Sequence, residues 1–419
     1  MHEAPAAELF DGEPSRSQPG AVPAWRASFV VMIGIVATTL AQHNLLARIP
    51  LRNLLKNDLH LDRTGMAAFL FVTGFAWYLQ PLFGAVIDAF PLFGSRRRSY
   101  LIVGAALASG GWAITGLVPH DYAPLLLAMA LTSSAMVLVS CATGGLLVET
   151  AQANGSAGKL AGIRQATNAL CFLVGAPVSG YLAGADFSWT ALACAVVVAA
   201  LVPVAAIFLP ERHLPAQPVS ALWHQLRTIG AARPMWAAGA IMLVFFIAPG
   251  TESALFFRQQ NELRMTTGGQ GWLVFAAYLA GIATALVYTR LCRQLSLQAL
   301  LLIGIGANAC TQALYLFYTS VPAAFVIEAI NGTGFALAEL AFLDLAARAT
   351  PRGSESLGYA LMISVRAFAL FGTDIVGANL LDHHGWHFEG LVVVNTATSL
   401  LAMPLVFLLP RTLRAQRDM

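Results

Sequence analysis

Charged side chains are scarce in this sequence. Asp, Glu, Lys and Arg together make up 11% of the 419 residues, whereas hydrophobic residues make up 58%. A water-soluble domain needs about a quarter of its residues charged to cover its surface. The composition therefore excludes an ordinary soluble protein. The net charge is only +3, and the basic residues are spread over loops, so the sequence carries no footprint of nucleic-acid binding.

Motifs for catalysis are also lacking. The sequence has no G-x-x-x-x-G-K-[ST] loop for nucleotides, no nucleophile elbow and no paired histidines at metal-ligand spacing. The five cysteines follow no disulfide or metal pattern, and four lie in apolar segments, so we expect them to be packing residues. His383, His384 and His387 gather in one loop; solvated histidines are favoured there over a weak metal site. We expect no enzymatic activity, no cofactor and no metal.

What the sequence has in abundance is apolar stretches of about 20 residues, each long enough to cross a bilayer as a helix. There are about twelve, at 26–47, 65–89, 99–118, 122–148, 162–184, 189–209, 234–257, 269–290, 298–318, 322–347, 358–380 and 388–409. The pattern predicts an all-α membrane protein. We expect an N-terminal half at 25–209 and a C-terminal half at 234–410, joined by a linker at 210–233 rich in Pro, His and Arg, with disordered and short tails at 1–24 and 411–419.

The basic residues predict the orientation of the chain. With the N-terminus in the cytoplasm, 17 of the 24 Lys and Arg residues fall in cytoplasmic segments and 6 in outer ones, while Arg366 lies within a span. Residues 1–24 have neither a basic start nor an apolar core, so they are not a cleavable signal. We expect both termini in the cytoplasm of a bacterial cell, with the spans in its inner membrane.

The two halves echo one another weakly. The stretch GGLLVETAQ (144–152) ends the fourth span, and AELAFLDLA (338–346) ends the tenth. Six plus six spans in parallel repeats, joined by a cytoplasmic linker, form the architecture of the major facilitator superfamily. In that architecture the substrate is bound near the bilayer midplane, between the halves.

A more specific pattern follows Trp77, in QPLFGAVIDAFPLFGSRRRSYL (80–101). Its order is Pro-Leu-aromatic-Gly, Asp, Pro-x-x-Gly and Arg-Arg-x-Tyr. Together with NLLKNDLHL (53–61) and YALMIS (359–364), it resembles the folate-biopterin transporter family of this superfamily, in patches over most of the chain. The resemblance implies transport, with folates or pterins as the leading substrates. Gln80 stands where that family usually has Lys, and Arg366 where it has small or amide residues. These departures point to a substrate that has diverged from folate.

The same stretch predicts a cytoplasmic gate. Asp88 ends an apolar helix that contains Gly84, and three arginines follow in the next turn: Arg96, Arg97 and Arg98. A carboxylate beside a basic turn suits a charged latch that also faces the positive end of a neighbouring helix. The alternative is that the arginines only set the topology and contact anionic lipid headgroups.

Three charged residues within spans are candidates for substrate or proton binding. Charges at membrane depth are costly and normally face a partner or a wet cavity. Arg366 suits a substrate carboxylate, and Glu339 suits its counter-ion or a proton carrier; a fixed ion pair bracing two helices is the alternative. Glu252 follows a Pro249–Gly250 pair that we expect to break the seventh span, where the carboxylate is either proton-coupling or merely solvated. Glu328 is expected toward the outer face.

Uncharged polar and aromatic residues complete the predicted substrate site. Gln42 and His43 lie in the outer part of the first span, Trp77 and Gln80 in the second, and Asn168 in the fifth. An aromatic ring stacks on a flat heterocycle, and amides bond its edge; ordinary packing between helices explains them equally well.

We therefore expect a monomeric secondary transporter that moves a small, flat anion through the lipid bilayer by alternating access, with protons as a candidate coupling ion. Proton-driven efflux of drugs or metabolites on the same fold is one alternative. A membrane sensor that binds its ligand without moving it is another.

Overall fold

The computed structural model describes residues 24–95, 97–154, 157–209, 219–351 and 355–415, and within these ranges the regular structure is helical. The first half of the chain contains ten helices in this part: α1 (Ala24–Leu40), α2 (Arg48–Asn57), α3 (Arg63–Thr73), α4 (Phe75–Tyr78), α5 (Gln80–Ala89), α6 (Arg98–Leu117), α7 (Tyr122–Asn154), α8 (Ala157–Leu182), α9 (Phe187–Ala199) and α10 (Leu201–Phe208).

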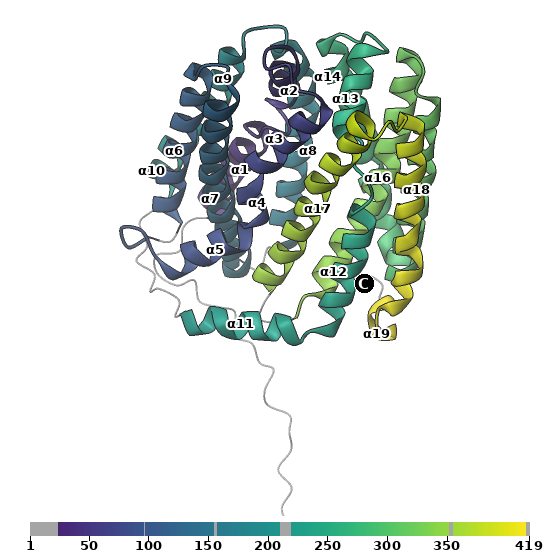
Figure 1. The fold of residues 1–419 in the computed structure, drawn as a ribbon. Coiled ribbons are helices and arrows are strands. Elements are labelled where there is room, and N and C mark those ends of the chain that lie inside the picture. Colours follow the sequence, from purple (N-terminus) through teal and green to yellow (C-terminus); the bar gives the residue numbers. More distant parts are fainter. Residues whose placement is uncertain (1–23, 96, 155–156, 210–218, 352–354, 416–419) are drawn as a thin grey trace, which may run out of the picture.

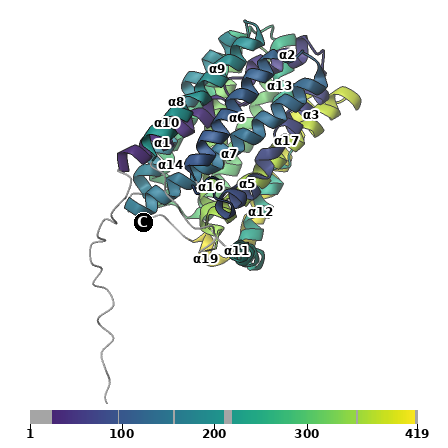
Figure 2. The same ribbon diagram turned by 90° about the vertical axis from the view of Figure 1, so that its left-hand side faces the viewer.

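The second half begins after α11 (Val219–Ala231), a helix within the expected linker that lies across one end of the molecule (Figure 1). It contains α12 (Arg233–Phe246), α13 (Glu252–Asn261), α14 (Thr267–Gln294), α15 (Leu297–Ala313), η1 (Leu314–Phe317), α16 (Val321–Ala349), α17 (Glu355–His383), α18 (Phe388–Leu405), η2 (Val406–Leu408) and α19 (Arg411–Arg414). Figures 1 and 2 both place α2 and α13 at one end, here named the α2 end, and α11 and α19 at the other, the α11 end.

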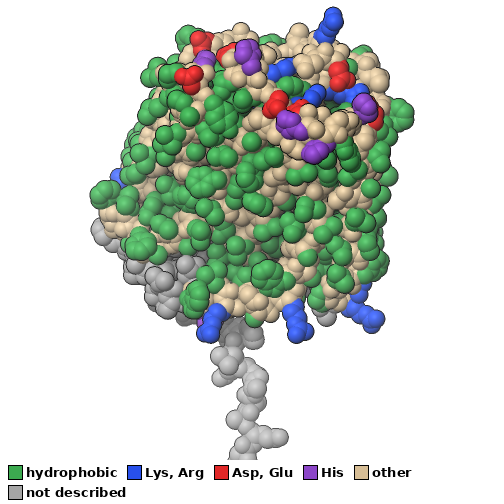
Figure 3. Space-filling view, viewed as in Figure 1, with side chains coloured by type: hydrophobic (Ala, Val, Ile, Leu, Met, Phe, Trp, Pro, Cys, Tyr) green, Lys and Arg blue, Asp and Glu red, His purple; other side chains and the backbone are tan. Residues whose placement is uncertain are grey.

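The helices match the expected spans. In the described part of the chain, eight helices are long and apolar enough to cross a membrane, and α1 and α12 are shorter apolar helices. The two remaining spans correspond to α8 and to the broken helix formed by α3, α4 and α5. The face in Figure 3 is covered by hydrophobic side chains between its two ends, and the charged side chains gather at those ends. The chain is a multi-pass integral membrane protein.

Helix breaks appear where the sequence favours them, with one surprise. The predicted break at Pro249–Gly250 is confirmed, because α12 ends at Phe246 and α13 starts at Glu252. The first span is shorter than predicted: α1 ends at Leu40, and residues 41–47 form turns. There the N–H of Leu46 donates to the carbonyl of Leu40, so the helical hydrogen-bond pattern is lost. Gln42 and His43 therefore lie in a turn and not on a helix.

Each half has its own hydrophobic core. One cluster of buried residues belongs almost entirely to α1–α10, and two others belong to the second half. The halves approach closely where α8 crosses α14: a Cβ atom on Gly180 would lie 2.6 Å from the carbonyl oxygen of Thr267, and one on Gly271 would lie 2.7 Å from that of Ala176. The halves also meet where helix α3 packs beside α17 (Figure 1). This arrangement leaves a space between the halves.

Candidate functional site

A cavity of about 540 Å³ lies between the two halves. Helices α2 and α8 line it from the first half, and α12 to α18 line it from the second. Its size is that of typical small-molecule sites. Four of the residues predicted to bind substrate or protons are among its lining: Asn168, Glu252, Glu339 and Arg366.

Arg366 of α17 and Glu339 of α16 form a two-point ion pair in this cavity. The Arg366 Nε lies 2.9 Å from one carboxylate oxygen, and its terminal nitrogen lies 2.8 Å from the other. The guanidinium also lies over the Phe246 ring, 5.1 Å from its centroid. Both side chains are about one-fifth exposed, so the pair faces the cavity while each charge has a partner.

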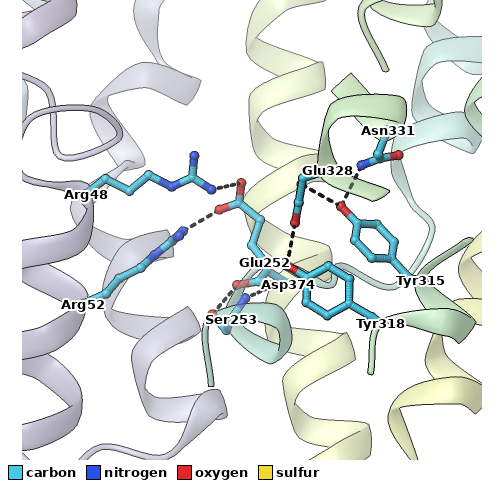
Figure 4. A network of polar contacts seen from close by, with 9 residues as sticks. All are labelled: Arg48, Arg52, Glu252, Ser253, Tyr315, Tyr318, Glu328, Asn331 and Asp374. Atoms are coloured by element: carbon cyan, nitrogen blue, oxygen red, sulfur yellow. Dashed lines mark hydrogen bonds and ion pairs between the residues drawn. The ribbon is translucent and has the colours of Figure 1, made fainter. Parts of the chain in front are cut away.

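A second group, which we name the α2–α13 ion-pair cluster, consists of Arg48, Arg52 and Glu252 (Figure 4). Glu252 is the first residue of α13, directly after the helix break. One of its oxygens lies 2.5 Å from Arg52, and the other lies 3.6 Å from Arg48. The two arginines belong to α2, so this cluster joins the halves. From the sequence, both arginines were counted only as outer-loop residues.

Other polar contacts hold the halves together at the α2 end. Arg63 of α3 forms an ion pair of 2.7 Å with Asp382 of α17. Lys56 donates to Gln260 at 2.8 Å and to Asn261 at 2.6 Å. Partial burial, together with the charge of Arg63, lowers the pKa of the Lys56 ammonium. The structure is therefore closed at the α2 end.

The cavity also contains an acidic group that sequence reasoning misplaced. Glu328 of α16, expected toward the outer face, lines the cavity and accepts hydrogen bonds from the hydroxyls of Tyr315 and Tyr318, each at 3.2 Å (Figure 4). The only available signal was a carboxylate inside an apolar span. Asp374 of α17 is buried and accepts from the N–H of Ser253 at 3.1 Å and from its hydroxyl at 2.5 Å, which ties α17 to the start of α13.

Aromatic and amide side chains occupy the wall between the charged groups. The rings of Phe172 on α8 and Tyr278 on α14 stack with centroids 4.2 Å apart and planes 23° apart. Asn168, one turn before Phe172, accepts a hydrogen bond of 2.7 Å from the hydroxyl of Thr39. Sequence reasoning missed the two rings, because nothing separates them from the other aromatics of apolar spans.

The other residues predicted to bind substrate lie elsewhere in this conformation; among the described residues, Gln42, His43, Trp77 and Gln80 do not line the cavity. His43 is buried, with its ring 6.2 Å from that of Phe371. Trp77 packs against the core of the first half. Their role in substrate binding stays a prediction.

The predicted cytoplasmic gate is described only in part. Arg96 and the side chain of Asp88 lie outside the described residues, so the latch between them stays a prediction. The Arg97 guanidinium lies against Gly145 of α7, and Arg98 donates to the carbonyl of Ala206 at 3.1 Å. A Cβ atom on Gly84 would meet no described atom within 4 Å, so this face of α5 borders open space.

Comparisons with known proteins agree with this architecture. The family model described as the BT1 family matches residues 42–316 and 323–419. A folate-biopterin transporter of Synechocystis sp. is 26% identical over 93% of this chain and 83% of its own length. Folate transporter 1 of Plasmodium falciparum is 21% identical over 85% of this chain and 75% of its own length.

Solved structures show the same fold. A mutant of the nucleoside transporter NupG superposes with a TM-score of 0.71 at 11% identity, covering 91% of this chain and 99% of that one. A D-xylose–proton symporter superposes with a TM-score of 0.68 at 12% identity, covering 94% and 99%. At these identities the likeness shows the fold alone. It is that of the major facilitator superfamily, as predicted from the sequence.

Proposed function

The chain belongs to the BT1 family, and from this membership we propose that it moves a small, planar anion, a folate or a pterin-like compound, across the membrane by alternating access. That it is a membrane transporter follows from its relatives and its fold. The nature of the solute, its charge and the coupling ion are parts of the proposal.

The observation that carries the proposal is the composition of the cavity. A stacked aromatic pair, Phe172 and Tyr278, lies in the same space as the guanidinium groups of Arg48 and Arg366. Aromatic faces suit a flat heterocycle, and a planar guanidinium fork suits a carboxylate. Amide groups such as Asn168 can bond the edge of the ring system. A folate carries both parts, a flat ring and carboxylates.

The contacts at the α2 end support the proposal of alternating access. The α2–α13 ion-pair cluster and the Arg63–Asp382 pair hold the α2 end closed. Separating these ion pairs, while the halves approach at the α11 end, would expose the cavity at the α2 end. By the distribution of basic residues, the α2 end faces out of the cell and the α11 end faces the cytoplasm of a bacterial inner membrane. The predicted latch of Asp88 with its arginines would close the latter end.

Coupling to protons is part of the proposal. Glu252 and Glu339, the two carboxylates that the sequence points to, are each held by arginine here. Each would take up a proton only after it parts from its arginine.

The test is uptake of labelled folate and labelled biopterin into proteoliposomes. We expect saturable uptake by the wild type and its loss in Arg366→Ala. Arg258→Gln, which alters ion pairs with Glu262 and Glu389 at the surface of the second half, is the matched control. If correctly inserted wild-type protein takes up neither compound, the proposed substrate class is wrong, and export or another organic anion must be tested.

A further inference from the structure

Glu328 differs from the other acidic residues of the cavity in its partners. Both of its oxygens accept hydrogen bonds from tyrosine hydroxyls, which are uncharged donors. In the part of the chain that the structure describes, no arginine or lysine forms an ion pair with it. Glu252 and Glu339 are paired with arginines. Asp374 of α17 accepts two hydrogen bonds from Ser253 at the start of α13.

The hydroxyls of Tyr315 and Tyr318 can both donate to the Glu328 carboxylate, but these hydrogen bonds are weak. Tyr315 accepts a hydrogen bond of 2.7 Å from Asn331, and Tyr318 accepts one of 2.9 Å from Gln259. Each tyrosine proton is therefore free to point at Glu328. The resulting contacts of 3.2 Å are longer than the ~2.7 Å usual for O–H···O bonds. A half-buried carboxylate at membrane depth whose donors are weak and neutral is stabilised by taking up a proton.

The charged and titratable groups around this site come from several elements. They are Tyr315 and Tyr318 beside it, Tyr278 on α14, Glu339 on α16, Arg366 and Asp374 on α17, Glu252 on α13, and Arg48 and Arg52 on α2. The first half contributes the arginines of α2 to this cavity, and the positive charge of Arg48 favours the ionised form of Glu328. Its distance from Glu328 must therefore change whenever the halves separate at the α2 end.

From this arrangement we propose that Glu328, rather than the arginine-paired Glu252 or Glu339, is the proton-binding site of the transporter and that Arg48 controls its occupancy. With the α2 end open, Arg48 moves away with α2, and Glu328 binds a proton from that side. With the α2 end closed, as here, Arg48 returns and the proton leaves toward the α11 end. This inference rests on the proposed function, because it assigns the coupling ion of the same transport cycle to one carboxylate.

The decisive variant is Glu328→Gln, which keeps the shape and the hydrogen bonds but cannot titrate. In proteoliposomes, wild type should accumulate labelled folate or biopterin when the medium is made acidic on the α2 side. Glu328→Gln should lose that accumulation at least tenfold and yet retain counterflow, the exchange of labelled for unlabelled compound. Glu389→Gln, a surface carboxylate of the same half, should behave like wild type. Accumulation by Glu328→Gln, or wild-type transport that ignores the pH gradient, would overturn the inference.

A second measurement does not depend on the substrate. Infrared difference spectra of the purified protein between acidic and alkaline pH should contain a protonated-carboxyl component that Glu328→Gln lacks and that Glu389→Gln and Glu328→Asp retain. If wild type shows counterflow of neither compound, the substrate proposal fails, and the spectra still decide the proton site. A Glu328→Gln spectrum that has the same carboxyl components as wild type refutes it.

Tyr318→Phe separates a proton site from a merely structural carboxylate. Removing one hydrogen-bond donor to the ionised form of Glu328 makes its protonation easier. The proton concentration that gives half-maximal accumulation should therefore fall roughly five- to tenfold, which is a shift to higher pH. A structural role would lower the rate without moving the pH profile, and that result would count against the proposal.

Discussion

The Arg52–Glu252 ion pair should hold the α2 end closed, and Arg52→Gln tests this. The Arg52 side chain is only 7% exposed, whereas that of Glu252 is 43% exposed. A charge-assisted hydrogen bond contributes about 1.5–3 kcal/mol when buried. Glu252 is partly solvated, and in Arg52→Gln it would still have Arg48 at 3.6 Å, so the contribution of Arg52 to the closed state is about 1–2 kcal/mol.

That free energy translates into a measurable shift of conformations. Since about 1.4 kcal/mol corresponds to a factor of ten, Arg52→Gln should favour states open at the α2 end by roughly 5- to 30-fold. The assay is the distance distribution between spin labels at Asn57→Cys on α2 and His384→Cys in the second half. The five native cysteines are replaced first. We expect a longer distance to gain population in Arg52→Gln.

Controls separate the ion pair from a general loss of stability. Arg258→Gln changes ion pairs within the second half at the same end, and it should leave the distribution unchanged. The charge-reversed double variant Arg52→Glu with Glu252→Arg should recover part of the short distance. The reasoning is refuted if Arg52→Gln gives the wild-type distribution, or if Arg52→Gln and Glu252→Gln have strictly additive effects in combination.

Three further predictions follow from the cavity and the packing of the halves. Arg366→Lys keeps the positive charge but loses the two-point contact with Glu339, so kcat/KM for uptake should fall about 10- to 100-fold. An unchanged kcat/KM would show that only the charge matters. Phe172→Ala should raise KM about fivefold or more through lost stacking, with Phe172→Tyr near wild type, and equal KM values for all three would remove the ring from the substrate site. Gly180→Val should force α8 from α14, destabilise the protein by about 1–3 kcal/mol through overpacking, and so lower the midpoint temperature of thermal unfolding in detergent. Gly110→Val should leave the midpoint unchanged, because a Cβ atom there meets nothing within 4 Å. Equal midpoints for the two variants would contradict the close crossing of α8 and α14.

Much of this architecture could be predicted from the sequence, because the bilayer constrains each helix separately. Apolar length predicts the spans, and Pro249 with Gly250 predicts the break in the seventh, since proline and glycine weaken a helix wherever it packs. The motif around 80–101 indicated the family that the comparisons then showed.

The composition of the cavity could be predicted only in part. Glu339 and Arg366 stood out because charges are rare at membrane depth, and they lie together. Their pairing, however, depends on how α16 and α17 are rotated about their axes, which residue types do not specify. Gln42 and His43 were assigned to a helix, but the chain turns after Leu40.

The tertiary structure decided which distant residues meet. Arg48 and Arg52 read as outer-loop charges until α2 was seen to fold back against α13, and Glu328 became a candidate only when Tyr315 and Tyr318 proved to be its neutral partners. Hydropathy acts on each segment alone and so determines that a helix crosses the membrane. The partner of a side chain depends on the packing of two helices from opposite halves, and that information is distributed over the whole chain.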